Sequence, residues 1–152
     1  MQVEYLVTSE EMKQYDANTI DILGIPGMVL MERAALGAFS LIEEKFGERE
    51  KSGLHVLIMA GMGNNGGDGL ALARLLSEAE YQVTVFCVGN PQHASEQWKK
   101  QKMILEHFPV KICDKMEEQE YTIMVDALFG VGLSREIEGD YARAVAAFNK
   151  AD

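Results

Sequence analysis

Three polar side chains in a glycine-rich segment could bind a small molecule. Residues 61–69 read Gly-Met-Gly-Asn-Asn-Gly-Gly-Asp-Gly, between an apolar run at 54–60 and a helix-like run at 70–76. Strand, glycine loop and helix is the arrangement in which α/β proteins hold anionic or hydroxyl-rich ligands, because backbone N–H groups can face the ligand directly. Asn64, Asn65 and Asp68 add hydrogen-bonding side chains. The pattern predicts a ligand-binding loop, with a helix that begins near Asp68.

A second segment carries a carboxylate and another glycine pair. Asp126 follows the apolar run 121–125, and residues 130–136 read Gly-Val-Gly-Leu-Ser-Arg-Glu. A carboxylate that ends a buried strand needs a partner, and the carboxyl ends of neighbouring parallel strands meet in one crevice. We therefore expect Asp126 to share a site with residues 64–68, where side-chain and backbone oxygens would suit a hard cation. Arg135 is the only basic residue of this segment and the candidate phosphate contact.

Asp68 has two possible roles. A carboxylate in the first turn of a helix can bind free backbone N–H groups and interact favourably with the helix dipole. Alternatively, it can accept hydrogen bonds from hydroxyl or amide groups of a ligand. The sequence leaves both roles open.

The first segment also contains the G-x-G-x-x-G pattern of dinucleotide dehydrogenases. Those enzymes place an acidic residue at the end of the second strand to bind the ribose, whereas residues 87–90 here are Cys-Val-Gly-Asn. Asp68 would in addition repel a pyrophosphate at the helix N-terminus. A hydride-transfer site is therefore not predicted.

The remaining pattern predicts the elements that position these segments. Thr8 and Glu11 have capping-box spacing before a helix that ends at Gly24. Alternating patterns predict a helix from Pro26 to Phe46, strands at 54–60, 81–88, 110–112 and 121–125, and helices at 68–77, after Pro91 and at 140–149. This alternation predicts a three-layer α/β/α sandwich with a mostly parallel Rossmann-like sheet and two N-terminal helices.

The second N-terminal helix has two features of its own. Residues 28–31 are apolar on every side, which predicts burial on more than one side. Small residues at 34, 35, 37 and 38 would let another backbone approach closely. Internal packing, a subunit interface and one wall of the site all remain possible roles, since methionine is common on adaptable contact surfaces.

Composition narrows the function classes. The chain has 152 residues, which suits one domain, and a net charge of −10, which argues against binding to nucleic acid or anionic membranes. No apolar run approaches membrane-spanning length, and the N-terminus lacks a signal-peptide pattern. Cys87 and Cys113 fit buried thiols rather than a disulfide framework. We expect a cytoplasmic protein.

The two segments together resemble a known family. Residues 61–70, 73–74 and 125–135 resemble the NAD(P)H-hydrate epimerases, and residues 24–27 and 30–35 look like the N-terminal helical stretch of that family. The resemblance runs along essentially the whole chain. The asparagine–glycine segment is far more specific than the dehydrogenase pattern nested within it.

The resemblance implies an isomerase of cofactor repair. Its members interconvert the R and S forms of hydrated NADH and NADPH, which carry a hydroxyl at C6 of the nicotinamide ring. It also implies a potassium ion bound by Asn65 and Asp126, a homodimer, and an ADP-dependent dehydratase that is fused or separate. The implied substrate-binding residues come from both segments: Asn64, Asn65, Gly66, Gly67, Asp68, Gly130, Val131, Gly132, Leu133, Ser134, Arg135 and Glu136.

Epimerisation at C6 is expected to proceed by loss and return of hydroxide, assisted by the lone pair of the ring nitrogen and by acid–base groups of the protein. The sequence names no catalytic acid or base. Family members continue into a further strand and a loop of Asp-x-Pro-Ser-Gly type that carries another potassium ligand. That motif is not found before Asp152. We therefore expect residues 1–152 to form a single, C-terminally incomplete domain, and a non-catalytic nucleotide-binding or protein-interaction module is the alternative function.

Overall fold

A parallel sheet forms the centre of the molecule. The computed structural model describes residues 5–117, 119–134 and 136–150. Its sheet has the order β3-β2-β1-β4, and every neighbouring pair is parallel. The strands are β1 (His55–Ala60), β2 (Gln82–Cys87), β3 (Lys111–Cys113) and β4 (Ile123–Ala127). The predicted parallel sheet is confirmed, with β3 and β4 at its edges.

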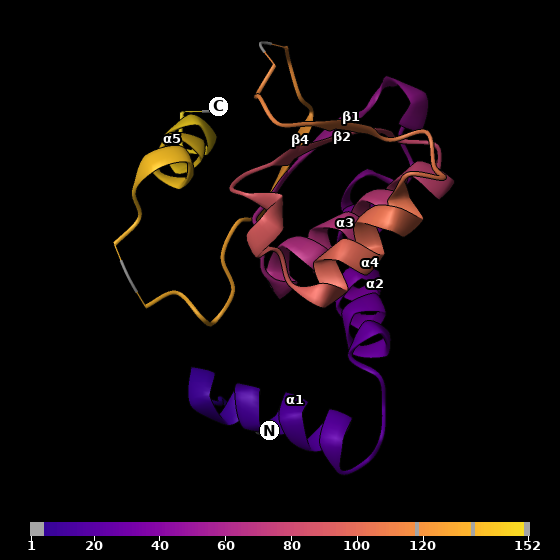
Figure 1. The fold of residues 1–152 in the computed structure, drawn as a ribbon. Helices are drawn as coiled ribbons and strands as arrows, with labels where there is room; N and C mark the ends of the chain where they lie inside the picture. The colour runs from indigo at the N-terminus through magenta and orange to yellow at the C-terminus, as the bar shows by residue number, and fades with distance from the viewer. Residues whose placement is uncertain (1–4, 118, 135, 151–152) are drawn as a thin grey trace.

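Helices cover both faces of this sheet (Figure 1). Val56 and Ile58 of β1 belong to the core shared with α2 (Gly27–Phe46), α3 (Asn64–Glu78) and α4 (Glu96–Leu105), whereas Leu57 and Met59 pack with α5 (Gly139–Phe148). This alternation is the period-2 pattern of a strand buried on both faces. The predicted three-layer α/β/α architecture is confirmed. Two short 3₁₀ turns, η1 (Lys51–Gly53) and η2 (Pro91–His93), lie in the connections.

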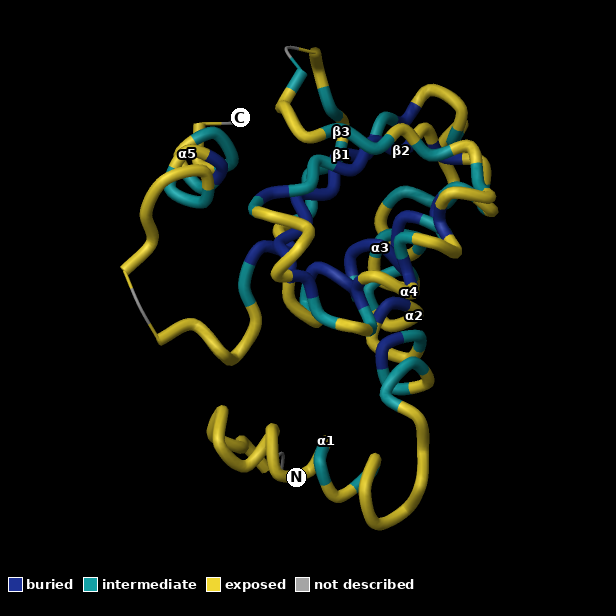
Figure 2. Tube along the Cα trace, viewed as in Figure 1, coloured by how far each residue is buried: buried dark blue, intermediate teal, exposed yellow. Residues whose placement is uncertain are grey.

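The first helix extends from the body of the protein. Helix α1 (Ser9–Asp21) begins with the predicted capping box, in which Thr8 accepts a hydrogen bond from the Glu11 backbone and Glu11 accepts one from the Thr8 backbone. None of its residues is buried (Figure 2). Capping rather than packing therefore defines where α1 begins.

Helix α2 packs along one side only. Its buried residues are Met31 and Ala35, whereas Val29 and Leu36 are 45% and 43% exposed. The predicted burial on more than one side is therefore wrong, because α3 covers a single stripe of α2. The Arg74 guanidinium joins the two helices, with Nη2 at 2.5 and 2.6 Å from the two carboxylate oxygens of Glu32.

Helix α3 begins earlier than predicted. It starts at Asn64 rather than near Asp68, with Gly63 as N-cap, so most of the expected loop is the first two turns of a helix. The reason is close packing: a Cβ at Gly66 would overlap the carbonyl oxygen of Gly61, and one at Gly69 would lie 2.7 Å from the Ala127 Cβ. The glycines let the helix start directly against the ends of β1 and β4.

Candidate functional site

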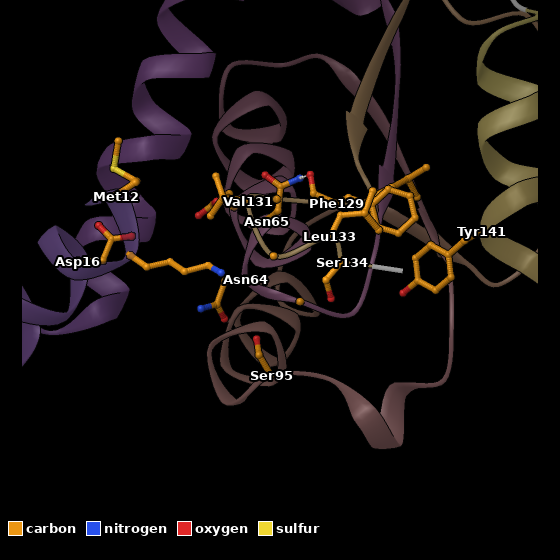
Figure 3. A pocket seen from close by; sticks show the side chains of 16 residues that line it. Met12, Asp16, Asn64, Asn65, Ser95, Phe129, Val131, Leu133, Ser134 and Tyr141 are labelled. Atoms are coloured by element: carbon orange, nitrogen blue, oxygen red, sulfur yellow. Dashed lines mark hydrogen bonds between the residues drawn. The ribbon is translucent and has the colours of Figure 1, made fainter. Parts of the chain in front are cut away.

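A cavity of about 930 Å³ lies where β1 and β4 end (Figure 3). The predicted residues Asn64, Asn65 and Asp68 line it together with the second segment, so the two segments meet as expected. Helices α1 and α5 and the residue before α4 complete it. The full lining is Met12, Lys13, Asp16, Gly63, Asn64, Asn65, Asp68, Ser95, Leu128, Phe129, Gly130, Val131, Gly132, Leu133, Ser134 and Tyr141.

The N-terminus of α3 opens into this cavity. Gly63 and Asn64 are exposed, and no side chain caps the first turn. Uncapped N–H groups at the positive end of a helix dipole are suited to an anionic group. The start of α3 can therefore bind a phosphate or a pyrophosphate.

A side-chain hydrogen bond joins the two segments. Nδ2 of Asn65 donates to the carbonyl oxygen of Phe129 over 2.8 Å. The side-chain oxygen of Asn65 accepts no hydrogen bond from the described residues, so it can still contact a ligand or a cation. Beyond Phe129, residues 130–134 are exposed, with Val131 and Leu133 at 54% and 47%.

Asp126 differs from the sequence prediction. It is exposed, not buried, because β4 is an edge strand of the described sheet. One carboxylate oxygen accepts a hydrogen bond of 2.9 Å from the Leu128 backbone N–H. The expected burial of this carboxylate is therefore wrong, whereas its expected partner is present as a backbone N–H, and Asp126 itself is not among the residues that line the cavity. Asp126 instead holds the turn that leads to Phe129, the residue to which Asn65 binds.

Asp68 has no capping role. It is the fifth residue of α3, beyond the N-cap positions, and α3 has no acidic residue in its first turn. Its carboxylate makes no hydrogen bond with any described residue. Burial, and secondarily the negative charge of Asp16, raises the pKa of Asp68 to about 6. Of the two roles that the sequence left open, the structure therefore favours the ligand-facing one.

Sequence reasoning missed the residues that α1 and α5 contribute. Met12 and Asp16 lie on one side of the cavity and Tyr141 on the other (Figure 3). The Tyr141 hydroxyl accepts a hydrogen bond of 3.2 Å from the Met62 backbone, and its ring lies 5.0 Å from the Phe129 ring. The only available signal for Tyr141 was its place on the apolar face of α5, which predicts packing rather than a site.

Some predicted site residues lie elsewhere. Gly66 and Gly67 are buried within α3 and do not line the cavity. Glu136 lines an adjoining cavity of about 340 Å³, which shares Phe129, Leu133 and Tyr141 with the first. Arg135 lies outside the described residues.

Residues 5–117, 119–134 and 136–150 contain no group of three or more His, Cys, Asp or Glu side chains able to hold a metal ion. Amide and carbonyl oxygens, rather than such a group, are the donors that a potassium site would use. Within the same ranges, the helices are too short or too polar to cross a membrane.

Comparison with known proteins gives a consistent result. Residues 27–152 match the family model described as YjeF-related protein N-terminus. The chain is 45% identical over 148 residues to an NAD(P)H-hydrate epimerase of Limosilactobacillus reuteri, covering 97% of this chain and 68% of the relative. It is 44% identical over 140 residues to one of Lentilactobacillus buchneri, covering 91% and 64%.

A solved structure agrees with the fold. The crystal structure of a yeast protein superposes with a TM-score of 0.86 at 27% sequence identity, covering 97% of this chain and 66% of the yeast chain. The present chain thus spans about two thirds of the proteins to which it is similar.

Proposed function

The chain belongs to the family of the YjeF-related protein N-terminus, together with the NAD(P)H-hydrate epimerases to which it is similar, and we propose that it epimerises the R and S forms of hydrated NADH and NADPH. The single observation that carries this proposal is the cavity where β1 and β4 end. Both segments of the epimerase resemblance line it, although they lie about 60 residues apart in the sequence.

The cavity suits a dinucleotide in its size and its donors. About 930 Å³ lies at the upper end of the range of small-molecule sites. The N-terminus of α3 supplies backbone N–H groups for the pyrophosphate, and Lys13 adds a positive charge from α1. Val131, Leu133 and Phe129 provide apolar surface against which a nicotinamide ring can pack.

We propose that a potassium ion binds beside this cavity through Asn65 and Asp126. Each has an oxygen without a hydrogen-bond partner among the described residues, and both hold the same turn at 126–129. Amide and carboxylate oxygens are hard donors that suit such a cation. The bound cation would offset the negative charge of Asp126 and of the anionic substrate, in a protein whose net charge is −10.

The decisive experiment starts from one purified epimer. In buffer containing potassium, the protein is expected to bring the two epimers to equilibrium faster than the protein-free control, with the ratio followed by chromatography. Asp126→Ala is expected to reduce the response of the rate to potassium, whereas Asp114→Ala, a change outside the cavity, is the matched control. An unchanged ratio at every time point would contradict the epimerase proposal.

Binding without turnover would instead support a non-catalytic nucleotide-binding module. Isothermal titration with the same epimer distinguishes the two outcomes, because it detects binding whether or not the epimer reacts. An ADP-dependent dehydratase, fused or separate, would be the enzyme that consumes the product, and the cytoplasm is the compartment in which both would act.

A second copy of the chain is the proposed partner of α1 and α2. Leu36 and Leu41 of α2 are 43% and 68% exposed, and Leu23 in the connection before α2 is 69% exposed. Exposed apolar side chains of this kind can be buried by a partner subunit. Light scattering is expected to give the mass of a homodimer, and Leu36→Lys is expected to lower it. A monomer at high concentration would contradict this part of the proposal.

A further inference from the structure

We propose that Asp68 is the acid–base residue of this epimerisation: its carboxyl group protonates the departing C6 hydroxyl and takes a proton back from the water that returns. This inference rests on the proposed function. Asp68 thereby has a catalytic role that no residue could be given from the sequence alone, and this role sets it apart from the other polar side chains of the cavity.

Asp68 has no structural role within α3. It is too far along α3 to cap the helix, and it has no hydrogen-bond or ion-pair partner among the described residues. A half-buried carboxylate without partners is destabilising, because desolvation is not compensated. Groups kept in such a state are concentrated at functional sites.

The surroundings of Asp68 favour its protonated form. The titratable side chains that line the cavity with Asp68 are Asp16 and Lys13 from α1 and Tyr141 from α5. Among the described residues, the segment 128–134 contributes no titratable side chain to this lining. Burial, and to a lesser extent the negative charge of Asp16, together raise the pKa of Asp68 to about 6. A carboxyl group with a pKa near neutrality can both give and accept a proton at physiological pH.

The other candidates are less suitable. Asp16 and Lys13 are exposed on a helix that buries no residue, so solvent surrounds them. The hydroxyl of Tyr141 is held by the Met62 backbone N–H. Two carboxylates whose environments differ take different roles. Here the half-buried Asp68 transfers the proton, and the exposed Asp16 acts as a positioning charge that keeps the proton on Asp68.

The step balances without an oxidant or reductant. The C6–O bond breaks as the lone pair of the ring nitrogen forms a second bond to C6, and the proton of Asp68 converts the leaving hydroxide into water. Water then attacks C6 from the opposite face, the ring nitrogen recovers its lone pair, and the proton released by that water returns to Asp68. The same steps in reverse convert the second epimer back into the first.

The test is the pH profile of kcat/KM, with the protein-free rate subtracted, since kcat/KM reports the ionisations of the free enzyme. For the unsubstituted chain, kcat/KM is expected to be constant below pH 6 and to fall about tenfold per pH unit above it, because only protonated Asp68 starts the reaction. Asp68→Asn is expected to lower kcat by about 10² to 10⁴-fold. This variant should still bind the substrate, and its residual kcat/KM should not fall above pH 6.

Asp16→Asn provides the second variant. Removal of its negative charge lowers the pKa of Asp68, so the fall in kcat/KM should begin at a lower pH. A purely structural role of Asp68 would not predict this shift. The inference is overturned if kcat/KM of Asp68→Asn still falls above pH 6, or if kcat of this variant decreases by less than about tenfold. It is also overturned if the fall in kcat/KM of Asp16→Asn begins at the same pH as in the unsubstituted chain. An inactive unsubstituted chain would instead refute the proposed function.

Discussion

The two segments that line the cavity differ in how they are held. The first segment is anchored in the core by its glycines: Gly66, Gly67 and Gly69 are buried, Gly66 lies against the Gly61 carbonyl and Gly69 lies against Ala127. Residues 130–134 are all exposed. The hydrogen bonds that restrain this segment lie just before it in the chain, where Asn65 donates to the Phe129 carbonyl and the Leu128 backbone N–H donates to Asp126. One half of the site is therefore fixed by the fold, whereas the other half depends on a few hydrogen bonds. A site with one rigid side and one adjustable side suits a reaction in which the C6 hydroxyl leaves from one face of the nicotinamide ring and returns to the other face.

The largest expected effect distinguishes a glycine of each segment. Gly66→Ala is expected to lower the free energy of unfolding by more than about 3 kcal/mol, because its Cβ would overlap backbone rather than a flexible side chain. Gly132→Ala meets nothing within 4 Å and should change it by less than about 0.5 kcal/mol. Urea unfolding of both variants measures the difference. Equal effects would show that the two segments are held alike.

The hydrogen bond between the segments should have an intermediate effect. Asn65→Ala leaves the half-buried carbonyl of Phe129 without its donor, and we expect a loss of about 1–2 kcal/mol. It should also make residues 130–134 more susceptible to limited proteolysis. Asn64→Ala is the control, because Asn64 is exposed and makes no side-chain hydrogen bond with a described residue. If both variants are cleaved at the same rate, Asn65 does not restrain the second segment.

The smallest effect concerns Asp68, and it depends on pH. The pKa of Asp68 is about 6 in the folded chain against an ordinary value of 3.8, so the folded state binds the proton more tightly. The chain therefore loses stability as pH rises from about 4 to 6, and Asp68→Asn avoids this loss. Discounted for the solvent that still reaches the side chain, the gain is about 1 kcal/mol above pH 7.

Thermal unfolding measures this gain. The melting temperature of Asp68→Asn should exceed that of the unsubstituted chain at pH 8 and equal it below about pH 4. The variant would then be more stable and less active, as expected where a site residue is kept at a cost to stability. A variant that is less stable at pH 8 would show that Asp68 has a structural partner.

The sequence predicted the architecture because that architecture is recorded in local patterns. The apolar run of β1, the capping box at Thr8 and the alternation of strands and helices each follow from short-range physics. The meeting of the two segments also followed, because parallel strands end at one edge of a sheet. These predictions needed only the order of the elements.

The features that the sequence did not predict depend on packing between distant residues. The start of α3 at Asn64 follows from contacts of its glycines with Gly61 and Ala127, which no local pattern records. The exposure of Asp126 follows from the place of β4 at the edge of the described sheet. The contribution of Tyr141 follows from where α5 packs, and a tyrosine on an apolar helix face gives no separate signal of a site.

If the two segments form one substrate site, a single substrate molecule should contact both, and an NMR titration can detect this. Hydrated NADPH is added to isotope-labelled protein while the backbone amide signals of residues 63–69 and 129–134 are followed. Both sets of signals are expected to shift and to saturate at the same substrate concentration. Shifts confined to one segment, or saturation at two different concentrations, would contradict a single shared site.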